Sequence, residues 1–297
     1  MKIKDSFSRK LFIFVNTLIM IGLIIITLYP MLYVLFASFS SPSALMAHEG
    51  LLLYPLKFTT IAYSAVAENP FIFSGYAITI WVVVVSVAIQ LVLTLFGAYF
   101  FTRKNVMHKK MLMLIIMFTV YVGGGLIPTY LMYKGMGLEN SLWVLVLPGM
   151  VNTTHLIILR TAIYGVPDSL EEAATIDGAG HYTILFKIIT PLVVPTLAVI
   201  AMYSIVGHWN AWFNASIFIR DRAKFPLQLI LREILIQNDT SSMDNALTSG
   251  VDMGEKAMLN TTIQYATIMV ATLPVLCIYP FLQKYFVKGT TIGAVKE

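Results

Sequence analysis

The stretch SLEEAATIDGAGHYTILFKIITPLVVP, from Ser169 to Pro195, places a short acidic and glycine-containing segment between two long apolar runs. Asp168 or Ser169 can serve as the N-cap of a helix, and Glu171 follows Asp168 by three positions, as in a capping box. Glu171 and Glu172 also suit the positive end of a helix dipole. The stretch therefore predicts a short helix that begins near Asp168.

This predicted helix has a face of small and acidic residues and is followed by a turn. Helical spacing gathers on that face Leu170, Ala173, Ala174 and Asp177. Two alanines on one face allow another surface to approach closely. Gly178 and Gly180 permit a sharp turn, with a positive φ expected at Gly178. A second short helix is then expected to carry on one side Tyr182, Leu185, Phe186 and Ile189.

The composition indicates an integral membrane protein. Of the 297 residues, 58% are hydrophobic and 12% are charged, whereas soluble globular chains carry about 25% charged residues. The basic residues mostly flank apolar runs, which is a pattern of membrane topology and not of nucleic-acid binding. Cys277 is the only cysteine, so no internal disulfide can form, and no Cys/His pair has the spacing of a metal site.

Six apolar segments are long enough to cross a membrane as helices, which takes about 20 residues each. They are residues 11–38, 76–102, 111–133, 141–165, 189–213 and 262–286. The sequence therefore predicts an all-α, polytopic membrane protein in which residues 1–297 form a single membrane domain. Two polar connections are prominent, one at about 168–190 and a longer one at about 214–260.

The distribution of Lys and Arg predicts the orientation in the membrane. The N-terminal tail, the loop that follows residue 102 and the C-terminal end are basic, whereas the short opposite loops hold only Lys57 and Lys134. Because basic loops stay in the cytoplasm, both termini and Lys104 are expected inside and Asp244 outside. The acidic connection at 168–190 is then cytoplasmic. It is either an amphipathic connector or a docking element for a cytoplasmic partner.

The motifs that the sequence lacks limit its chemistry. It has no G-x-x-x-x-G-K-[ST] segment and no Gly-Lys dipeptide, so nothing indicates an ATP site of its own, and we expect no catalytic residues. Carboxylates cluster in the loops and not in the predicted spans, which argues against ion-coupled transport. An ion-coupled secondary transporter and a non-transporting membrane assembly protein remain as alternatives.

The segment EAATIDGAGHYTILFKIITP resembles the EAA signature of ABC-importer permeases. That signature reads E-A-A, three residues, G, nine residues, I, one residue and L-P, and it is matched by Glu172, Ala173, Ala174, Gly178, Ile188 and Pro191. Thr190 replaces the usual leucine. The six spans, AYFFTRK at the end of the second span and the C-terminal FVKGTTIGAVKE extend the resemblance over nearly the whole chain. Within these importers the chain is similar to carbohydrate-uptake permeases of the maltose type. The segment GGGLIPTYLMYKGMGLENSLWVLVLPG resembles the branch that serves oligosaccharides.

This resemblance implies a type I importer fold, with a transmembrane core at about residues 73–284, in the bacterial cytoplasmic membrane. It implies as partners a second related permease, two ATPase subunits that use ATP and Mg²⁺, and an extracytoplasmic binding protein that delivers the carbohydrate. The chain itself would hold no cofactor. The acidic loop would couple the ATPase to the pore, through Glu171, Glu172, Ala173, Ala174, Asp177, Gly178, Ile188 and Pro191.

Aromatic and amide side chains in the predicted spans are candidates for a sugar path, because aromatic faces suit sugar rings and polar groups suit their hydroxyl rims. The candidates are Tyr121, Asn152, His155, Trp209, Asn210 and Trp212. The same residue types also act as anchors at the membrane interface, or as hydrogen-bonding groups between helices.

Overall fold

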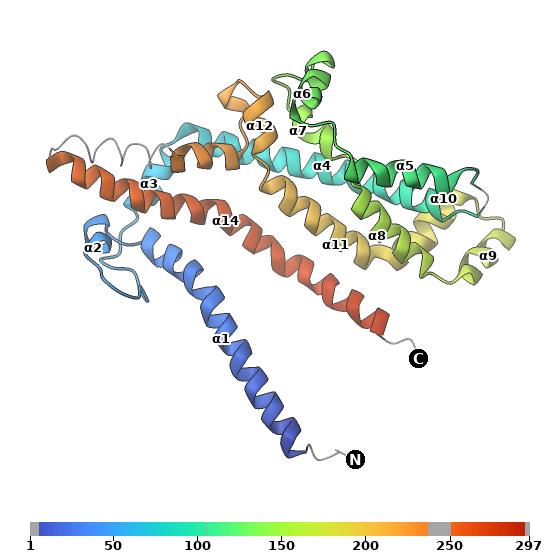
Figure 1. Cartoon of the computed structure of the whole chain (residues 1–297), viewed down its shortest axis with the longest axis horizontal. Helices are drawn as coiled ribbons and strands as arrows, with labels where there is room; N and C mark the ends of the chain where they lie inside the picture. Colours follow the sequence, from blue (N-terminus) through green and yellow to red (C-terminus); the bar gives the residue numbers. More distant parts are fainter. Residues whose placement is uncertain (1–5, 105, 237–250, 295–297) are drawn as a thin grey trace. The chain divides into compact units, whose positions relative to one another are not determined.

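The computed structural model describes residues 6–104, 106–236 and 251–294, with the backbone alone for 251–257, 279 and 281–294. These residues form helices and loops, without strands (Figure 1). The longer helices are α1 (Phe7–Ser38), α4 (Pro70–Thr102), α11 (Thr190–Trp209) and α14 (Val251–Ala294). The shorter helices are α2 (Pro42–Met46), α3 (Ile61–Ala67), α5 (Lys109–Tyr121), α6 (Leu126–Gly135), α7 (Trp143–Val146), α8 (Thr153–Tyr164), α9 (Asp168–Ile176), α10 (His181–Thr183), α12 (Phe213–Phe218) and a helix at 227–236.

Within the described residues, four continuous helices are long and apolar enough to cross a membrane. They are Phe7–Ser38, Pro70–Thr102, His181–Trp209 and Met258–Ile278. Two further spans are possible, each made of two helices joined at a bend, Lys109–Tyr121 with Leu126–Gly135 and Trp143–Gly149 with Thr153–Tyr164. The all-α, polytopic class is confirmed, and the number of spans is six when each bent pair counts as one.

The third predicted span, residues 111–133, is not one helix. α5 ends at Tyr121, α6 begins at Leu126, and the two helices are bent by 114° relative to each other. Three consecutive glycines at 123–125 account for the break, because glycine weakens a helix and Gly125 adopts a φ of +80°. A bend of this size makes the pair a broken span or a re-entrant segment.

The fourth predicted span, residues 141–165, is also broken. α7 continues into a 3₁₀ turn at Leu147–Gly149, and α8 then starts in a direction that differs by 46°. Pro148 within the turn lacks an amide hydrogen, so it cannot make a regular helical hydrogen bond. Asn152 is the N-cap of α8, because its side chain accepts a hydrogen bond from the His155 amide at 3.1 Å.

The fifth span begins and ends earlier than the predicted 189–213. The helix is continuous from His181 to Trp209, because a π turn at Ile184–Ile189 leads directly into α11. The π turn precedes Pro191, whose missing amide hydrogen and bulky ring disturb the hydrogen bonds of the turn before it. The Thr190 hydroxyl donates to the Leu185 carbonyl at 2.8 Å. The residue that departs from the EAA signature thus satisfies a carbonyl within the π turn.

The long connection predicted at about 214–260 begins inside α12 and contains short helices of its own. A 3₁₀ turn at Arg222–Lys224 and the helix at 227–236 follow α12. Arg220 forms an ion pair with Glu139, with 2.5 Å between Nη2 and Oε1. Residues 237–250, which include Asp244, lie outside the described residues, and α14 extends beyond the predicted 262–286 at both ends.

The chain divides into two compact units. One comprises residues up to Pro70 together with 231–272, and the other comprises 71–230 together with the residues from 273 onward. In the second unit α4, α8 and α11 lie side by side (Figure 1). Their main core consists of Leu95, Ala98, Tyr99, Leu159, Ile163, Ile184, Leu185, Ile189, Val193 and Ile200. All the residues predicted to have a functional role lie in this second unit.

Candidate functional site

α9 presents the acidic segment at the surface of the second unit. The predicted capping box is wrong, because the N-cap residue is Pro167 and no side chain caps the helix. Asp168 is instead the first helical residue, and together with Glu171 it lies in the first turn. Carboxylates at this position interact favourably with the positive end of the helix dipole, as expected for Glu171, whereas the same expectation for Glu172 is wrong because Glu172 lies beyond the first turn.

The turn after α9 depends on Gly178, as predicted. Its φ of +81° lies in the left-handed region, which costs a residue with a side chain about 1–2 kcal/mol. The Ala179 amide donates to the Ala174 carbonyl at 2.9 Å, and the Gly178 amide donates to the Thr175 carbonyl at 3.0 Å. These two bonds satisfy carbonyls at the helix end. Gly180 has an ordinary φ of −75°, so only position 178 requires glycine.

The two alanines of α9 have different surroundings. Ala174 is partly buried against the main core of its own unit, whereas Ala173 is exposed. The two alanines thus do not share one environment, and Ala173 is the more accessible of the two. Glu172 is also exposed, and Ile176 is 86% exposed. Positions 172, 173 and 176 share one side of the helix, and we call Glu172, Ala173 and Ile176 the outer α9 face.

Ile176 was not among the residues singled out from the sequence. The sequence did contain a signal for Ile176, because an isoleucine on the polar side of an amphipathic helix indicates a contact outside the core of the chain. Asp177, which was singled out, is the exposed C-cap residue of α9. An exposed isoleucine beside a small alanine offers a contact area that burial in this chain alone does not use.

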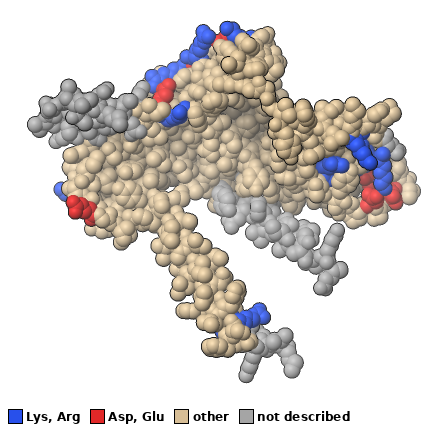
Figure 2. Space-filling model, viewed as in Figure 1, with Lys and Arg blue, Asp and Glu red and all other residues tan. Residues whose placement is uncertain are grey.

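Two ion pairs join α9 to the segment that follows α4. Arg103 pairs with Glu171, and their side chains are only 19% and 24% exposed. The Lys104 ammonium donates to the Asp168 carboxylate at 2.8 Å, between side chains that are both exposed. This bond lowers the pKa of Asp168 and raises the pKa of Lys104. Figure 2 shows acidic and basic side chains beside each other at the end of the molecule that carries α9.

Arg103 also contacts the end of α4, and through it the start of α10. Its guanidinium carbon lies 4.0 Å from the centroid of the Tyr99 ring, and the Tyr99 hydroxyl is 3.3 Å from His181 Nδ1. We call Tyr99, Arg103, Glu171 and His181 the Arg103 cluster. The sequence analysis used Arg103 as part of a basic loop and of the AYFFTRK segment, because nothing in a single sequence shows that it meets Glu171.

Burial separates the side chains that were predicted to share one side of the second short helix. Leu185 and Ile189 are each 1% exposed, whereas Tyr182 and Phe186 are 73% and 49% exposed. The prediction is wrong because the π turn has more residues per turn than an α-helix, so positions drift around the axis. Ile188 packs against the main core.

The candidates for a sugar path at the bend before α8 have different environments. Asn152 is occupied as the helix cap. His155 is 8% exposed, its ring is stacked with that of Tyr203 at 6.3 Å between centroids, and its Nδ1 has no hydrogen-bond partner within the described residues. Tyr121 ends α5 and is 82% exposed. The structure thus brings Asn152 and His155 together through the cap of α8.

The candidates at the end of α11 are mainly packing residues. Trp209 is 4% exposed, with its ring centroid 6.1 Å from that of Tyr76. Trp212 packs against a smaller core that includes Phe218. Asn210 is the C-cap residue of α11 and is exposed. Of these three candidates, only Asn210 offers a polar group at the surface.

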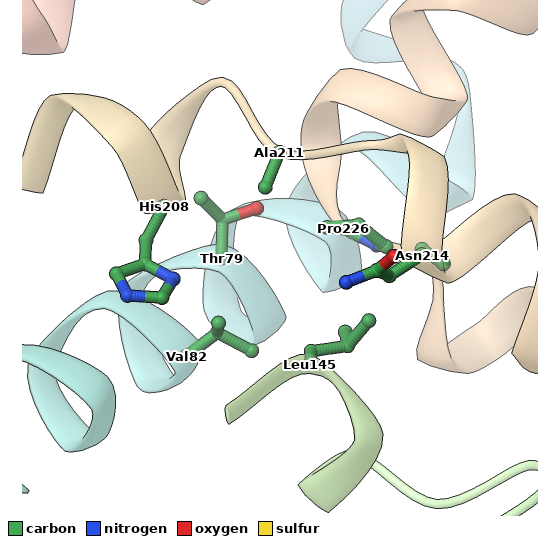
Figure 3. A pocket seen from close by; sticks show the side chains of 8 residues that line it. Thr79, Val82, Leu145, His208, Ala211, Asn214 and Pro226 are labelled. Atoms are coloured by element: carbon green, nitrogen blue, oxygen red, sulfur yellow. The ribbon is translucent and has the colours of Figure 1, made fainter. Parts of the chain in front are cut away.

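A small cavity lies between α4, α7 and the loops at the end of α11. It is lined by Thr79, Val82, Leu145, His208, Ala211, Asn214, Ala215 and Pro226. Figure 3 shows the side chains of His208, Thr79 and Asn214 around this space. Its volume is about 20 Å³, which is room for roughly one water molecule. The cavity is therefore too small to hold a sugar.

A buried amide on α4 joins three helical segments, and the sequence interpretation missed it. Gln90 is 3% exposed, and its Nε2 donates to the Gly149 carbonyl at 2.9 Å. The Ser204 hydroxyl of α11 donates to the Gln90 Oε1. Gly149 lies at the bend between α7 and α8. Because buried polar groups in a membrane need partners, a lone glutamine in an apolar span was the signal that marked this position.

Comparison with known proteins gives a consistent set of relatives, although no family model matches the sequence. The chain is 37% identical over 289 residues to Protein LplC of Bacillus subtilis, covering 97% of this chain and 96% of that protein. It is 37% identical over 277 residues to the polygalacturonan/rhamnogalacturonan transport system permease protein YtcP of the same organism, covering 92% and 93%.

A solved structure has the same fold. It is the crystal structure of a bacterial ABC transporter involved in the import of the acidic polysaccharide alginate. One of its chains matches with a TM-score of 0.83 and 28% sequence identity, covering 96% of this chain and 100% of that chain. The breaks in the third and fourth spans therefore occur within an architecture that a solved transporter shares.

Proposed function

Because this chain belongs to the maltose-type family of carbohydrate ABC transporter permeases, we propose that α9 is the element by which it docks on an ATPase subunit. The chain is a permease subunit of an ABC importer for oligo- or polysaccharides, and it is a multi-pass protein of the bacterial cytoplasmic membrane. It transports and is not itself an ATPase.

The outer α9 face is the observation that carries the docking proposal. Ala173 provides a site without bulk, so a cleft of the partner can close on the helix. Ile176, 86% exposed, supplies apolar area at the same place. Glu172 is exposed on the same side, and a basic side chain of the ATPase would pair with it. Gly178 then turns the chain back toward α10 and the membrane.

The wider assembly follows from the family. We place this chain beside a second permease, above two ATPase subunits that bind ATP and Mg²⁺, and below a binding protein that delivers the carbohydrate. The names of the relatives refer to polygalacturonan/rhamnogalacturonan and to the acidic polysaccharide alginate. They favour a saccharide of several units as the cargo.

We propose that the sugar passes between this chain and the second permease. The cavity beside Thr79 and His208 has room for roughly one water molecule and is too small for a sugar, which supports a route walled by both permeases. Asn210 and Tyr121 are exposed and are the candidates for direct contact. The other candidates, Asn152, His155, Trp209 and Trp212, would shape the route by holding the helices in place.

Substitution of Ala173 tests the docking role. Ala173→Trp should fill the space that the ATPase cleft needs, so the ATPase should no longer co-purify with the chain in mild detergent. Ala67→Trp is the matched control, because Ala67 is also an exposed alanine in a short helix, α3, far from the docking face in the sequence. Membrane insertion should be normal in both variants. Wild-type recovery of the ATPase with Ala173→Trp would contradict the proposal.

A transport assay separates this function from the rival classes. Uptake should require the binding protein, ATP and the ATPase subunits together. Uptake by this chain alone, driven by a proton or sodium gradient, would favour an ion-coupled transporter. Complete absence of uptake by the full assembly, with every subunit present, would favour an assembly protein.

A further inference from the structure

The acidic residues of α9 fall into two groups, those that pair with cations of the same chain and one that belongs to the outer α9 face. Glu172 belongs to the outer face, whereas Glu171 and Asp168 turn to Arg103 and Lys104 of the same chain. A helix that only received a partner would need no such ties to its own chain. Glu171 and Asp168, which pair with cations of their own chain, therefore have a separate task from that of Glu172.

The two ion pairs differ in how firmly they hold α9. Lys104 and Asp168 are 77% and 68% exposed, so water and salt weaken their attraction. Arg103 and Glu171 are 19% and 24% exposed, so their attraction is screened much less. Removing one partner of a largely buried pair also leaves the other charge without compensation. The Arg103–Glu171 pair thus holds α9 to the end of α4 more strongly than the Lys104–Asp168 pair does.

The side chain of Arg103 is held from several sides. Its guanidinium lies on the Tyr99 ring, and its Nη2 donates to the Thr102 hydroxyl at 3.2 Å. The Lys109 ammonium donates to the Arg103 carbonyl at 2.7 Å, which fixes the backbone after α4. A planar guanidinium held in this way offers a fixed direction to a carboxylate, which a lysine would not.

The helix α4, which ends beside Arg103, is hydrogen-bonded to two other segments of the helix bundle. Gln90 of α4 is bonded both to Gly149, at the bend before α8, and to Ser204 of α11. A shift of α4 along its axis would therefore act on the bend in the fourth span and on α11. Rigid helices joined by hydrogen bonds are the kind of network that carries such coupling.

We propose that Arg103 is a positioning residue that transmits movement of the docked α9 helix to α4 through Glu171. The inference rests on the proposed docking of α9, and it adds a path within this chain from the docking helix to the spans. Glu172 would then recruit the ATPase, while the Arg103 cluster would transmit the movement of α9 to the helix bundle.

A double-substitution cycle in the complete reconstituted transporter tests this path. The variants are Arg103→Gln, Glu171→Gln and the combination of both, which remove the charges; glutamine matches glutamate in length and is shorter than arginine. Lys104→Gln with Asp168→Asn is the matched control at the exposed pair. The measured quantities are the amount of bound ATPase and the stimulation of ATP hydrolysis by sugar-loaded binding protein.

Each single substitution in the Arg103–Glu171 pair should lower the stimulation by roughly tenfold or more, because the ion pair is lost and a partly buried charge is left without its partner. The double variant should be no worse than the single ones, since both remove the same link. Bound ATPase should stay at the wild-type level, and the control pair should behave nearly as wild type. Arg103→Lys should recover part of the stimulation.

Other results would overturn the inference. Wild-type stimulation in Glu171→Gln, which leaves Arg103 on the Tyr99 ring, would show that the pair transmits nothing even if Arg103→Gln fails to fold. Loss of the bound ATPase in that variant would assign Glu171 to docking. Independent losses that multiply in the double variant would also contradict a shared path. Failure of the wild-type chain to recruit an ATPase would instead refute the proposed function itself.

Discussion

The Lys104 ammonium donates a hydrogen bond to the Asp168 carboxylate at 2.8 Å, and this exposed pair ties the segment after α4 to the first turn of α9. The bond lowers the pKa of Asp168 from an ordinary value of 3.8 and raises the pKa of Lys104 from 10.5. A carboxyl with a lowered pKa contributes stability above its unfolded pKa and loses it as the pH falls through the folded value. A lysine with a raised pKa contributes stability below its unfolded pKa and loses it as the pH rises through the folded value.

The pair should therefore be fully charged across the neutral range and should give no pH dependence there. Transport by the wild-type complex and by Lys104→Gln should follow the same pH profile from about pH 5 to about pH 9. The check is uptake by proteoliposomes at a series of pH values. A profile that changes shape near neutral pH in Lys104→Gln alone would contradict this account.

The positive φ of Gly178 predicts a position-specific effect of an added methyl group. No atom lies within 4 Å of a Cβ built at Gly178 or at Gly180, so neither substitution causes a clash. Gly178→Ala should nevertheless cost about 1–2 kcal/mol, because the left-handed conformation is unfavourable for alanine. Limited proteolysis should cut the turn after α9 faster in Gly178→Ala and at the wild-type rate in Gly180→Ala. Equal rates in the two variants would contradict the assigned turn.

The buried amide of Gln90 should matter for the stability of the bundle. Gln90→Leu keeps the size of the side chain and removes its bonds to Gly149 and Ser204, so a loss of about 1–3 kcal/mol is expected from two interhelical hydrogen bonds. Ser204→Ala removes only one of them and should have the smaller effect. The measurement is denaturation of the purified chain in detergent. Unchanged denaturation of Gln90→Leu would mean that the amide does not hold the bend in the fourth span.

The orientation predicted from Lys and Arg can be tested with two lysines. In a chain with Cys277→Ser, Lys104→Cys should react with a membrane-impermeant thiol reagent only from the cytoplasmic side, and Lys134→Cys only from the outside. Asp244→Cys, outside the described residues, is predicted to label from the outside as well. Labelling of Lys104→Cys and Lys134→Cys from the same side would rule out the predicted topology.

The sequence predicted the spans well where hydrophobicity alone decides them, as in α1 and α4. It failed at the bends after Tyr121 and after Gly149, because the same apolar residues suit a straight or a bent helix. The glycines at 123–125 and Pro148 were visible beforehand. Whether they break a span depends on neighbouring segments that a single sequence does not place.

The helix α9 and its terminal turn were predictable because their signals are local. Gly178 could be assigned a positive φ from the end of the acidic helix, and the structure has it. The Arg103–Glu171 pair and the Gln90 bonds were not predictable, because each joins residues far apart in the sequence. The burial of Ala174 was missed for the same reason, since its packing partners come from the main core.

The central claim is that the outer α9 face docks on the ATPase and so couples its cycle to this permease, and Glu172 tests it most directly. Glu172→Lys reverses the charge at an exposed site of α9, so the helix and the Arg103–Glu171 pair should persist, while the attraction between Glu172 and Lys104 is lost. Glu68→Lys makes the same charge change at the exposed C-cap residue of α3 and serves as the control. If Glu172 merely interacted with the helix dipole, the loss would be about 0.3–1 kcal/mol and transport would be nearly intact.

The decisive measurement is ATP hydrolysis by the reconstituted complex with and without sugar-loaded binding protein, together with pull-down of the ATPase. We predict that Glu172→Lys inserts in the membrane normally but loses the stimulation or releases the ATPase, while Glu68→Lys retains both. Wild-type stimulation and wild-type ATPase recovery with Glu172→Lys would show that α9 is only a connector between spans.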